Sequence, residues 1–258
     1  MKAKLAPDAD KQLTALLDNA DVKGFVKQLA FDALGKLPES KPADEALAAW
    51  CDKYLADGVP GELKLDVLEA TKARAEKDKL KLHADLRAKL KAIDTAARAG
   101  EAKDHLSRYR ESLLGGDAAK GRDIVLNNSA VYCQRCHKLD GQGGEVGPPM
   151  NGIAKDKTRD YLLESITHPN KQIAKGYESV ILVLLDGRSI SGVLKGKDAQ
   201  NYTVVTAENK TLVIPVADVD AAKPDKSAMP EDLIKKLSKR ELRDVVEFLS
   251  GLTELPAK

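Results

Sequence analysis

The 258-residue chain contains few cysteines, methionines and aromatic residues. Its three cysteines are too few for a disulfide framework, and two of them lie in one short motif. The third, Cys51, lies on an apolar helical stripe. It is therefore predicted to be a small buried hydrophobe, with pairing to another molecule as the alternative. Aromatic residues make up 4% of the sequence and hydrophobic residues 43%, so the composition favours helices packed through small and aliphatic side chains.

The sequence also lacks an excess of charge of one sign and a long apolar run. Its 42 basic and 40 acidic residues give a formal net charge of +2, so the charge balance predicts no nucleic acid and no anionic membrane as a partner. No window of roughly 18 uninterrupted apolar residues is present, so no membrane insertion is expected. Residues 1–8 have neither the apolar segment nor the cleavage pattern of a signal peptide.

Apolar residues recur at helical spacing through the first 114 residues. The four stripes are Leu13, Leu16 and Leu17; Phe25, Val26, Leu29, Ala30, Ala33 and Leu34; Leu47, Trp50, Cys51, Tyr54 and Leu55; and Leu63, Leu65, Val67 and Leu68. Further helices are predicted from about Lys79 to Ile93 and from about Glu101 to Leu114, before the glycine pair Gly115-Gly116. Short antiparallel helices are typical of an α-solenoid of the HEAT kind, although no clean repeat is visible. We expect a HEAT-like helical domain over residues 1–114.

A second domain is expected over residues 115–258. Helices are predicted over residues 118–127, 158–167 and 239–249. Asp117 is placed to cap the first of these helices, and Ser238 with Glu241 forms a capping box at the start of the last. The overall fold class is therefore mainly α.

Residues 176–222 interrupt this helical pattern with β-type residues. Strands are predicted over residues 180–185, 190–194, 202–206 and 211–216, and Asp186-Gly187 is a strong hairpin signal. We expect four or five strands that form a small sheet or barrel, inserted into the second domain.

The sequence Cys133-Gln134-Arg135-Cys136-His137 is a C-x-x-C-H motif, which is typical of c-type haem attachment. Each thiol would add to one haem vinyl group, and the two-residue gap lets both sulfurs reach the same porphyrin edge. The adjacent histidine would then bind the iron through Nε2. The motif predicts one covalently attached haem c, with Cys133 and Cys136 as its attachment points and His137 as an axial ligand.

Zinc binding and thiol chemistry are the alternatives for this motif. A zinc site needs two more ligands, and none of the remaining candidates forms a matching second pair. These candidates are Cys51, His83, His105 and His168. A thioredoxin-like motif should lie between a strand and a helix, whereas this one follows a predicted helix and precedes a loop rich in glycine and proline.

Met229 is the first candidate for the sixth iron position. It lies in the irregular segment Ser227-Ala228-Met229-Pro230, and a thioether ligand stabilises ferrous iron. The β insert accounts for about half of its separation from His137, so the insert looks grafted into a compact domain. Met150, His168 and an open site are the rivals. On the other side of the iron, the Pro148 carbonyl is the candidate acceptor for the second ring N–H of His137.

From about Tyr109 onward, the chain resembles the PVC-type (planctomycete and verrucomicrobial) CxxCH haem-binding domain, a cytochrome c-like family. The matching stretches are 115–122, Cys133 to His137, Gly143 to Pro148, 161–166, Ile173 to Tyr177, Ser227 to Pro230 and 241–249. The resemblance implies a class I cytochrome c fold with His/Met ligation and a β insert. One departure is Val125, where class I cytochromes tend to have an aromatic residue; Gly121 and Phe248 should still pack where the first and last helices cross.

These observations predict an electron-transfer protein and not an enzyme. The alternative is haem-based catalysis or sensing at an open or displaceable sixth site. Haem c is attached outside the cytoplasm, so we expect a periplasmic or secreted location and a segment of a longer protein. The resemblance implies that relatives often form the C-terminal part of a larger secreted oxidoreductase. We therefore expect a redox partner protein or domain, with the helical region as a docking scaffold and the β insert as an interaction module.

Overall fold

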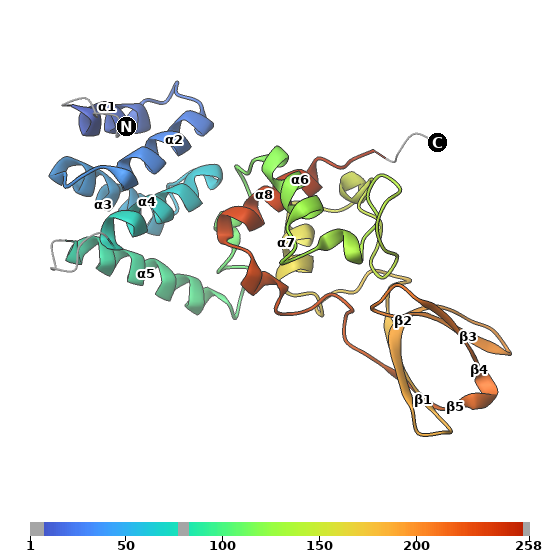
Figure 1. Ribbon diagram of the computed structural model, residues 1–258. Helices are drawn as coiled ribbons and strands as arrows, with labels where there is room; N and C mark the ends of the chain where they lie inside the picture. Colours follow the sequence, from blue (N-terminus) through green and yellow to red (C-terminus); the bar gives the residue numbers. More distant parts are fainter. Residues whose placement is uncertain (1–7, 77–82, 255–258) are drawn as a thin grey trace. The chain divides into compact units, whose positions relative to one another are not determined.

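A computed structural model describes residues 8–76 and 83–254 of the chain. The chain divides into two units, Met1–Gly115 and Gly116–Lys258. The described residues contain eight α-helices and one five-stranded antiparallel sheet (Figure 1). The start of the helix predicted from Lys79 lies outside the described residues.

Helices joined by turns build the described part of the first unit. They are α1 (Ala9–Asp18), α2 (Gly24–Lys36), α3 (Lys41–Leu55), α4 (Lys64–Glu76) and α5 (Ala84–Gly100), with the 3-10 turns η1 (Gly61–Leu63) and η2 (Arg110–Ser112). The Ser40 hydroxyl caps α3 by accepting a hydrogen bond from the Ala43 amide. Gly35 of α2 lies directly against Ala70 of α4, where an added Cβ would stand 2.9 Å from the Ala70 Cα. The two helices therefore pack closely at this point.

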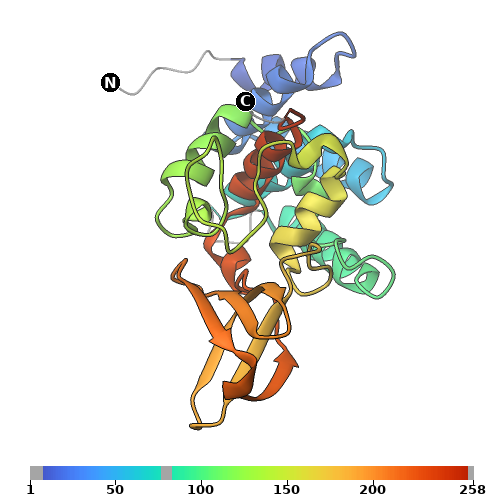
Figure 2. The same ribbon diagram turned by 90° about the vertical axis from the view of Figure 1, so that its right-hand side faces the viewer.

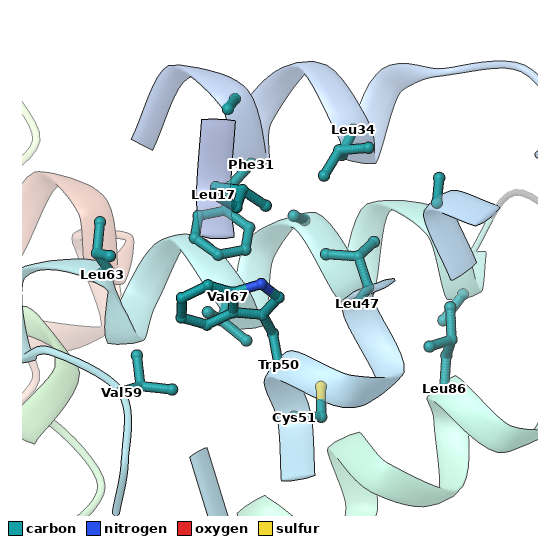
Figure 3. Packing of buried hydrophobic residues seen from close by; sticks show 14 of the residues in the cluster. Leu17, Phe31, Leu34, Leu47, Trp50, Cys51, Val59, Leu63, Val67 and Leu86 are labelled. Carbon is teal, nitrogen blue, oxygen red and sulfur yellow. The ribbon is translucent and has the colours of Figure 1, made fainter. Parts of the chain in front are cut away.

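The core of the first unit surrounds Trp50 (Figure 3). The Phe31 ring contacts the Trp50 ring edge to face, with centroids 5.2 Å apart. Cys51 is fully buried, and its Sγ lies 3.4 Å from the Thr71 hydroxyl. The burial predicted for Cys51 from the helical stripe is confirmed.

The predicted apolar face of α2 was wrong in part. Phe25 and Leu29 are 59% and 63% exposed, whereas Phe31, which was not assigned to the stripe, is fully buried. The close packing of Gly35 on α4 fixes the rotation of the helix, and this rotation carries Phe31 into the core. The packing of the neighbouring helix decided the buried face, which hydrophobic spacing within α2 did not specify.

The helix predicted from Glu101 to Leu114 is also wrong. Helix α5 continues to Gly100, and turns with the short η2 follow it. The Asp104 carboxylate accepts a hydrogen bond from the Leu106 amide and pairs with the Arg110 side chain. Ser107 donates to the Ala97 carbonyl. These side-chain bonds to nearby backbone groups compete with helix formation.

The second unit combines three helices with the sheet. The helices are α6 (Ala118–Asn127), α7 (Arg159–Thr167) and α8 (Lys239–Ser250), and the 3-10 turns are η3 (Cys133–Arg135), η4 (Ile153–Lys155), η5 (Val216–Asp218) and η6 (Leu233–Lys236). The Asp117 cap of α6 and the capping box of Ser238 and Glu241 are both present as predicted.

Helices α6 and α8 cross at Gly121. A Cβ at this glycine would stand 1.9 Å from the Asp244 carbonyl oxygen and 2.8 Å from the Phe248 Cβ, so only glycine allows the contact. The predicted packing of Gly121 against Phe248 is confirmed. Val125, at the position where the resemblance leads one to expect an aromatic residue, is fully buried. Two hydrogen bonds of 2.8 and 2.9 Å between Arg159 and Glu247 join α7 to α8.

The five strands are consecutive in the chain. They are β1 (Ser179–Leu184), β2 (Ser189–Lys197), β3 (Asn201–Val205), β4 (Thr211–Pro215) and β5 (Val219–Pro224), in the spatial order β4-β3-β2-β1-β5. Gly187 has a φ of +85° in the predicted hairpin turn between β1 and β2. Figures 1 and 2 show a sheet that curls on itself, and it encloses a core of its own that includes Leu182, Val204 and Ile214.

Candidate haem site

The C-x-x-C-H motif forms one tight turn after α6. Tyr132 precedes it with a φ of +40°, and η3 starts at Cys133. The Cys133 carbonyl accepts hydrogen bonds from the amides of Cys136 and His137, at 3.1 and 3.0 Å. Both motif cysteines are free and half-buried. The turn therefore keeps two thiols and an imidazole within one short stretch of backbone.

His137 is held by the loop that follows the motif. Its Nδ1 lies 2.8 Å from the Pro148 carbonyl oxygen, so Nδ1 carries the proton and Nε2 is left for a metal. Gly147 lies directly against the ring, where an added Cβ would stand 2.4 Å from Cε1. Burial lowers the pKa of His137. The imidazole is therefore neutral at pH 7, which is its metal-binding form.

Burial favours the protonated thiol in both motif cysteines, whereas redox catalysis needs a thiolate. Burial raises the pKa of Cys133 to about 11, and it also raises the pKa of Cys136. Reactive cysteines in thioredoxin-like motifs have a lowered pKa. The environment therefore favours the thiol form of both residues over a reactive thiolate.

Backbone hydrogen bonds join the loop at 138–150, called the proximal loop from here on, to the motif. The Gly144 amide donates to the Gln134 carbonyl at 2.9 Å, and the Gly147 amide donates to the Cys136 carbonyl at 2.7 Å. The Met150 amide donates to the Lys138 carbonyl at 2.8 Å. The position of Pro148 relative to His137 is thus fixed by bonds on both sides of it.

The three side chains that are candidates for the sixth position occupy different surroundings. Met229 is half-buried in a loop that begins where the Ser227 amide donates to the Asn170 side chain. Its neighbour Ala228 packs on an apolar cluster that also contacts Cys136, which brings this loop to the motif. Met150 is buried and its backbone is bonded within the proximal loop. His168 accepts or donates one hydrogen bond at Nδ1, with the Thr167 hydroxyl 2.8 Å away.

Asn209, at the tip of the hairpin between β3 and β4, is a site residue that the sequence analysis missed. Its Nδ2 donates to the Arg135 carbonyl, between the two motif cysteines, and its Oδ1 accepts from the Glu145 amide at 2.9 Å. Two cavities of about 440 and 500 Å³ lie between the motif loops and the sheet, and Val205 and Thr211 line both. The sequence indicates a turn at Asn209, but it carries no signal for the contact across 64 and 74 residues.

The geometry of a haem attachment turn agrees with a comparison to known families. Residues 118–180 match the family model described as Cytochrome c. No curated protein matches the chain significantly. The second unit thus contains a cytochrome c-like haem domain, a class of domain that carries covalently bound haem c and acts in electron transfer. Among the described residues, no group of three or more His, Cys, Asp or Glu side chains could hold a metal ion. None of the helices in the described ranges could span a membrane.

Proposed function

We propose that the chain is a mono-haem c-type cytochrome that passes electrons between protein partners. One observation carries the proposal: His137 donates its Nδ1–H to Pro148, which leaves Nε2 for a metal, in the same turn as two free cysteines. When bound, the haem would supply an iron that changes its charge by one electron. The protein would anchor it through Cys133 and Cys136 and orient His137.

Met229 is the proposed second axial ligand. Its loop is fixed through the Ser227 amide and packs beside Cys136 through Ala228. A thioether at this position stabilises ferrous iron and raises the reduction potential. With both axial positions filled by protein, the site would exchange electrons and would not bind a substrate.

The helical unit fits a HEAT-like scaffold in a larger protein. The main packing contacts of α1 to α5 join helices that are one or two positions apart in the chain, as expected for a stacked repeat. We infer that this segment docks a redox partner protein or domain. By resemblance, the chain would be a PVC-type CxxCH segment of a secreted or periplasmic oxidoreductase.

The test is to express the chain with a periplasmic signal in a host that attaches haem c. The oxidised and reduced spectra of the purified protein are recorded, together with those of Met229→Ala and of the matched control Met150→Ala. We expect a c-type reduced spectrum and a near-infrared thioether-to-ferric band that is lost only in Met229→Ala.

Two other outcomes would contradict parts of the proposal. A wild-type protein without covalent haem would overturn the attachment site and favour thiol or metal chemistry at Cys133 and Cys136. Covalent haem without the thioether band would overturn the ligand Met229 and favour haem-based catalysis or sensing at an open sixth site.

A further inference from the structure

We propose that Asn209 of the β insert is a positioning residue for the haem site. It would hold the attachment turn (Cys133 to His137) and the proximal loop at a fixed distance from each other. This distance would set the strength of the hydrogen bond from His137 to Pro148. The inference rests on the proposed ligation of iron by His137. It gives the insert a role inside the haem domain.

Asn209 makes two side-chain hydrogen bonds to the backbone around the motif. Its Nδ2 donates to the Arg135 carbonyl in the middle of the motif, and its Oδ1 accepts from the Glu145 amide, three residues before Pro148. One side-chain amide therefore joins the two backbone segments that carry the iron ligand and its hydrogen-bond acceptor. Asparagine suits this task because its side chain combines a donor and an acceptor.

Gly144 lies in close contact with both Arg135 and Asn209. An added Cβ at Gly144 would stand 2.1 Å from the Arg135 carbonyl oxygen and 2.5 Å from the Asn209 Oδ1. A shift of Asn209 is therefore passed directly to Gly144 and Glu145. From there the chain reaches Gly147, whose amide bonds to Cys136 and whose Cα lies against the His137 ring.

The body of the insert supports the tip through an apolar contact. Val193 of β2 and Val205 of β3 are buried together with Val146 of the proximal loop, and Cys136 and Ala228 pack on the same cluster. The insert thus contacts the attachment turn, the proximal loop and the loop that carries Met229. Its position relative to these loops is fixed by packing as well as by the two bonds of Asn209.

The backbone conformation of Asn209 would also accept glycine, so the side chain can be removed without disturbing the turn. Its φ of +59° lies in the left-handed region, where glycine is the favoured residue and asparagine is among the tolerated ones. The turn itself is closed by backbone bonds from Asn209 to Thr206 and from Thr206 to Lys210. A glycine at this position would therefore form the turn with less strain, but it would lose the hydrogen bonds to Arg135 and Glu145.

The strength of the hydrogen bond to Pro148 affects how strongly His137 donates electrons to iron. A hydrogen bond from Nδ1–H to a fixed acceptor makes the imidazole a stronger donor to a metal. A stronger donor favours ferric iron. When the proximal loop is released, this bond weakens, ferrous iron gains relative stability and the reduction potential rises.

The experiment uses the full haem-loaded chain with Asn209→Gly, Asn209→Asp and the control Asp57→Gly. Asp57 also has a positive φ, of 55°, but lies in the first unit with an exposed bond to Lys64, so the control makes the same backbone change away from the site. The measurements are the midpoint potential and the hydrogen exchange rate of the Glu145 amide. Asn209→Asp keeps the acceptor for Glu145 and loses the donor to Arg135, and as a milder change it covers the case in which the glycine variant fails to fold.

We expect the potential to rise and the Glu145 amide to exchange at least tenfold faster in Asn209→Gly. The Glu145 amide should exchange more slowly in Asn209→Asp than in Asn209→Gly, because the acceptor is kept, and both quantities should be unchanged in Asp57→Gly. A haem-loaded Asn209→Gly protein with wild-type potential would overturn the inference, even if its melting temperature fell. A wild-type chain that takes up no haem would overturn the proposed function instead. In that case, exchange of the Glu145 amide in the haem-free chain would still test whether Asn209 holds the proximal loop.

Discussion

The Nδ1 atom of His137 lies 2.8 Å from the carbonyl oxygen of Pro148, although the two residues are separated by eleven positions in the chain. The contact depends on the intervening loop, which returns to the motif through the Gly144 and Gly147 amides. It fixes the tautomer of the imidazole and leaves one nitrogen for iron.

Replacing Gly147 with alanine should displace His137. The new Cβ would stand 2.4 Å from the ring Cε1, so the ring or the loop must move. We expect a loss of about 1–3 kcal/mol in the free energy of unfolding and a lower yield of haem-loaded protein. Thermal unfolding and haem absorbance per protein measure the two effects. Gly196→Ala is the control, because no heavy atom lies within 4 Å of its added Cβ; an equal loss there would contradict the steric explanation.

Replacing Cys133 and Cys136 together with alanine should abolish covalent haem attachment. Haem that remains bound should then be extracted by acidified acetone, and the band seen after haem staining of a denaturing gel should disappear. Cys51→Ala should keep the stained band, because Cys51 is buried in the core of the first unit. It should only reduce stability, by about 1 kcal/mol. A stained band in the double variant would refute attachment at these cysteines.

Replacing Glu247 with glutamine should destabilise the second unit at neutral pH but not in acid. The hydrogen bonds from Arg159 hold the pKa of Glu247 below its usual value of 4.5. A lowered pKa means that the ionised side chain stabilises the folded state above that value, and that this contribution is lost as the pH falls below it. The difference between wild type and variant should be about 1 kcal/mol at pH 7, should shrink as the pH falls below 4.5, and should vanish once the pH lies below the lowered pKa of Glu247.

Chemical unfolding across this pH range measures the difference directly. Asp156→Asn is the control, because Asp156 is exposed and its closest approach to Lys157 is 4.0 Å. It should change stability little at any pH. A constant difference between Glu247→Gln and wild type at all pH values would show that the ion pair is not its cause.

Replacing Gly121 with alanine should separate the crossing helices. The added Cβ would stand 1.9 Å from a backbone oxygen of Asp244, which a side-chain rotation cannot relieve. We expect a loss of roughly 1–3 kcal/mol, or failure to fold. At Gly251, just beyond the end of the same helix α8, the nearest atom would be 3.4 Å away, so Gly251→Ala should be tolerated. Thermal unfolding of the two variants, followed by circular dichroism, measures the difference in stability.

Local features of this chain were predictable because their causes lie within a few residues. Asp117 accepts from the amides of Ala119 and Lys120, and Ser238 exchanges hydrogen bonds with Glu241, so each helix start is encoded by its own neighbours. Four of the strands and the Gly187 turn followed from residue type in the same way. The range of β5 was not predicted, and this strand continues two residues beyond the predicted insert. The C-x-x-C-H motif is equally local, since its spacing alone specifies the chemistry that it can support.

By itself, the sequence determined the attachment motif and most of the helix and strand positions. It also led us to expect that the Pro148 carbonyl accepts the hydrogen bond from His137. Only the tertiary structure decided which face of α2 is buried, that residues 101–114 form turns and that Asn209 reaches the haem loops. These features depend on atoms that approach across many residues, such as Gly35 on Ala70 and Asn209 on Arg135. Such contacts form where packing leaves no other space, and no local pattern records which residues will meet there.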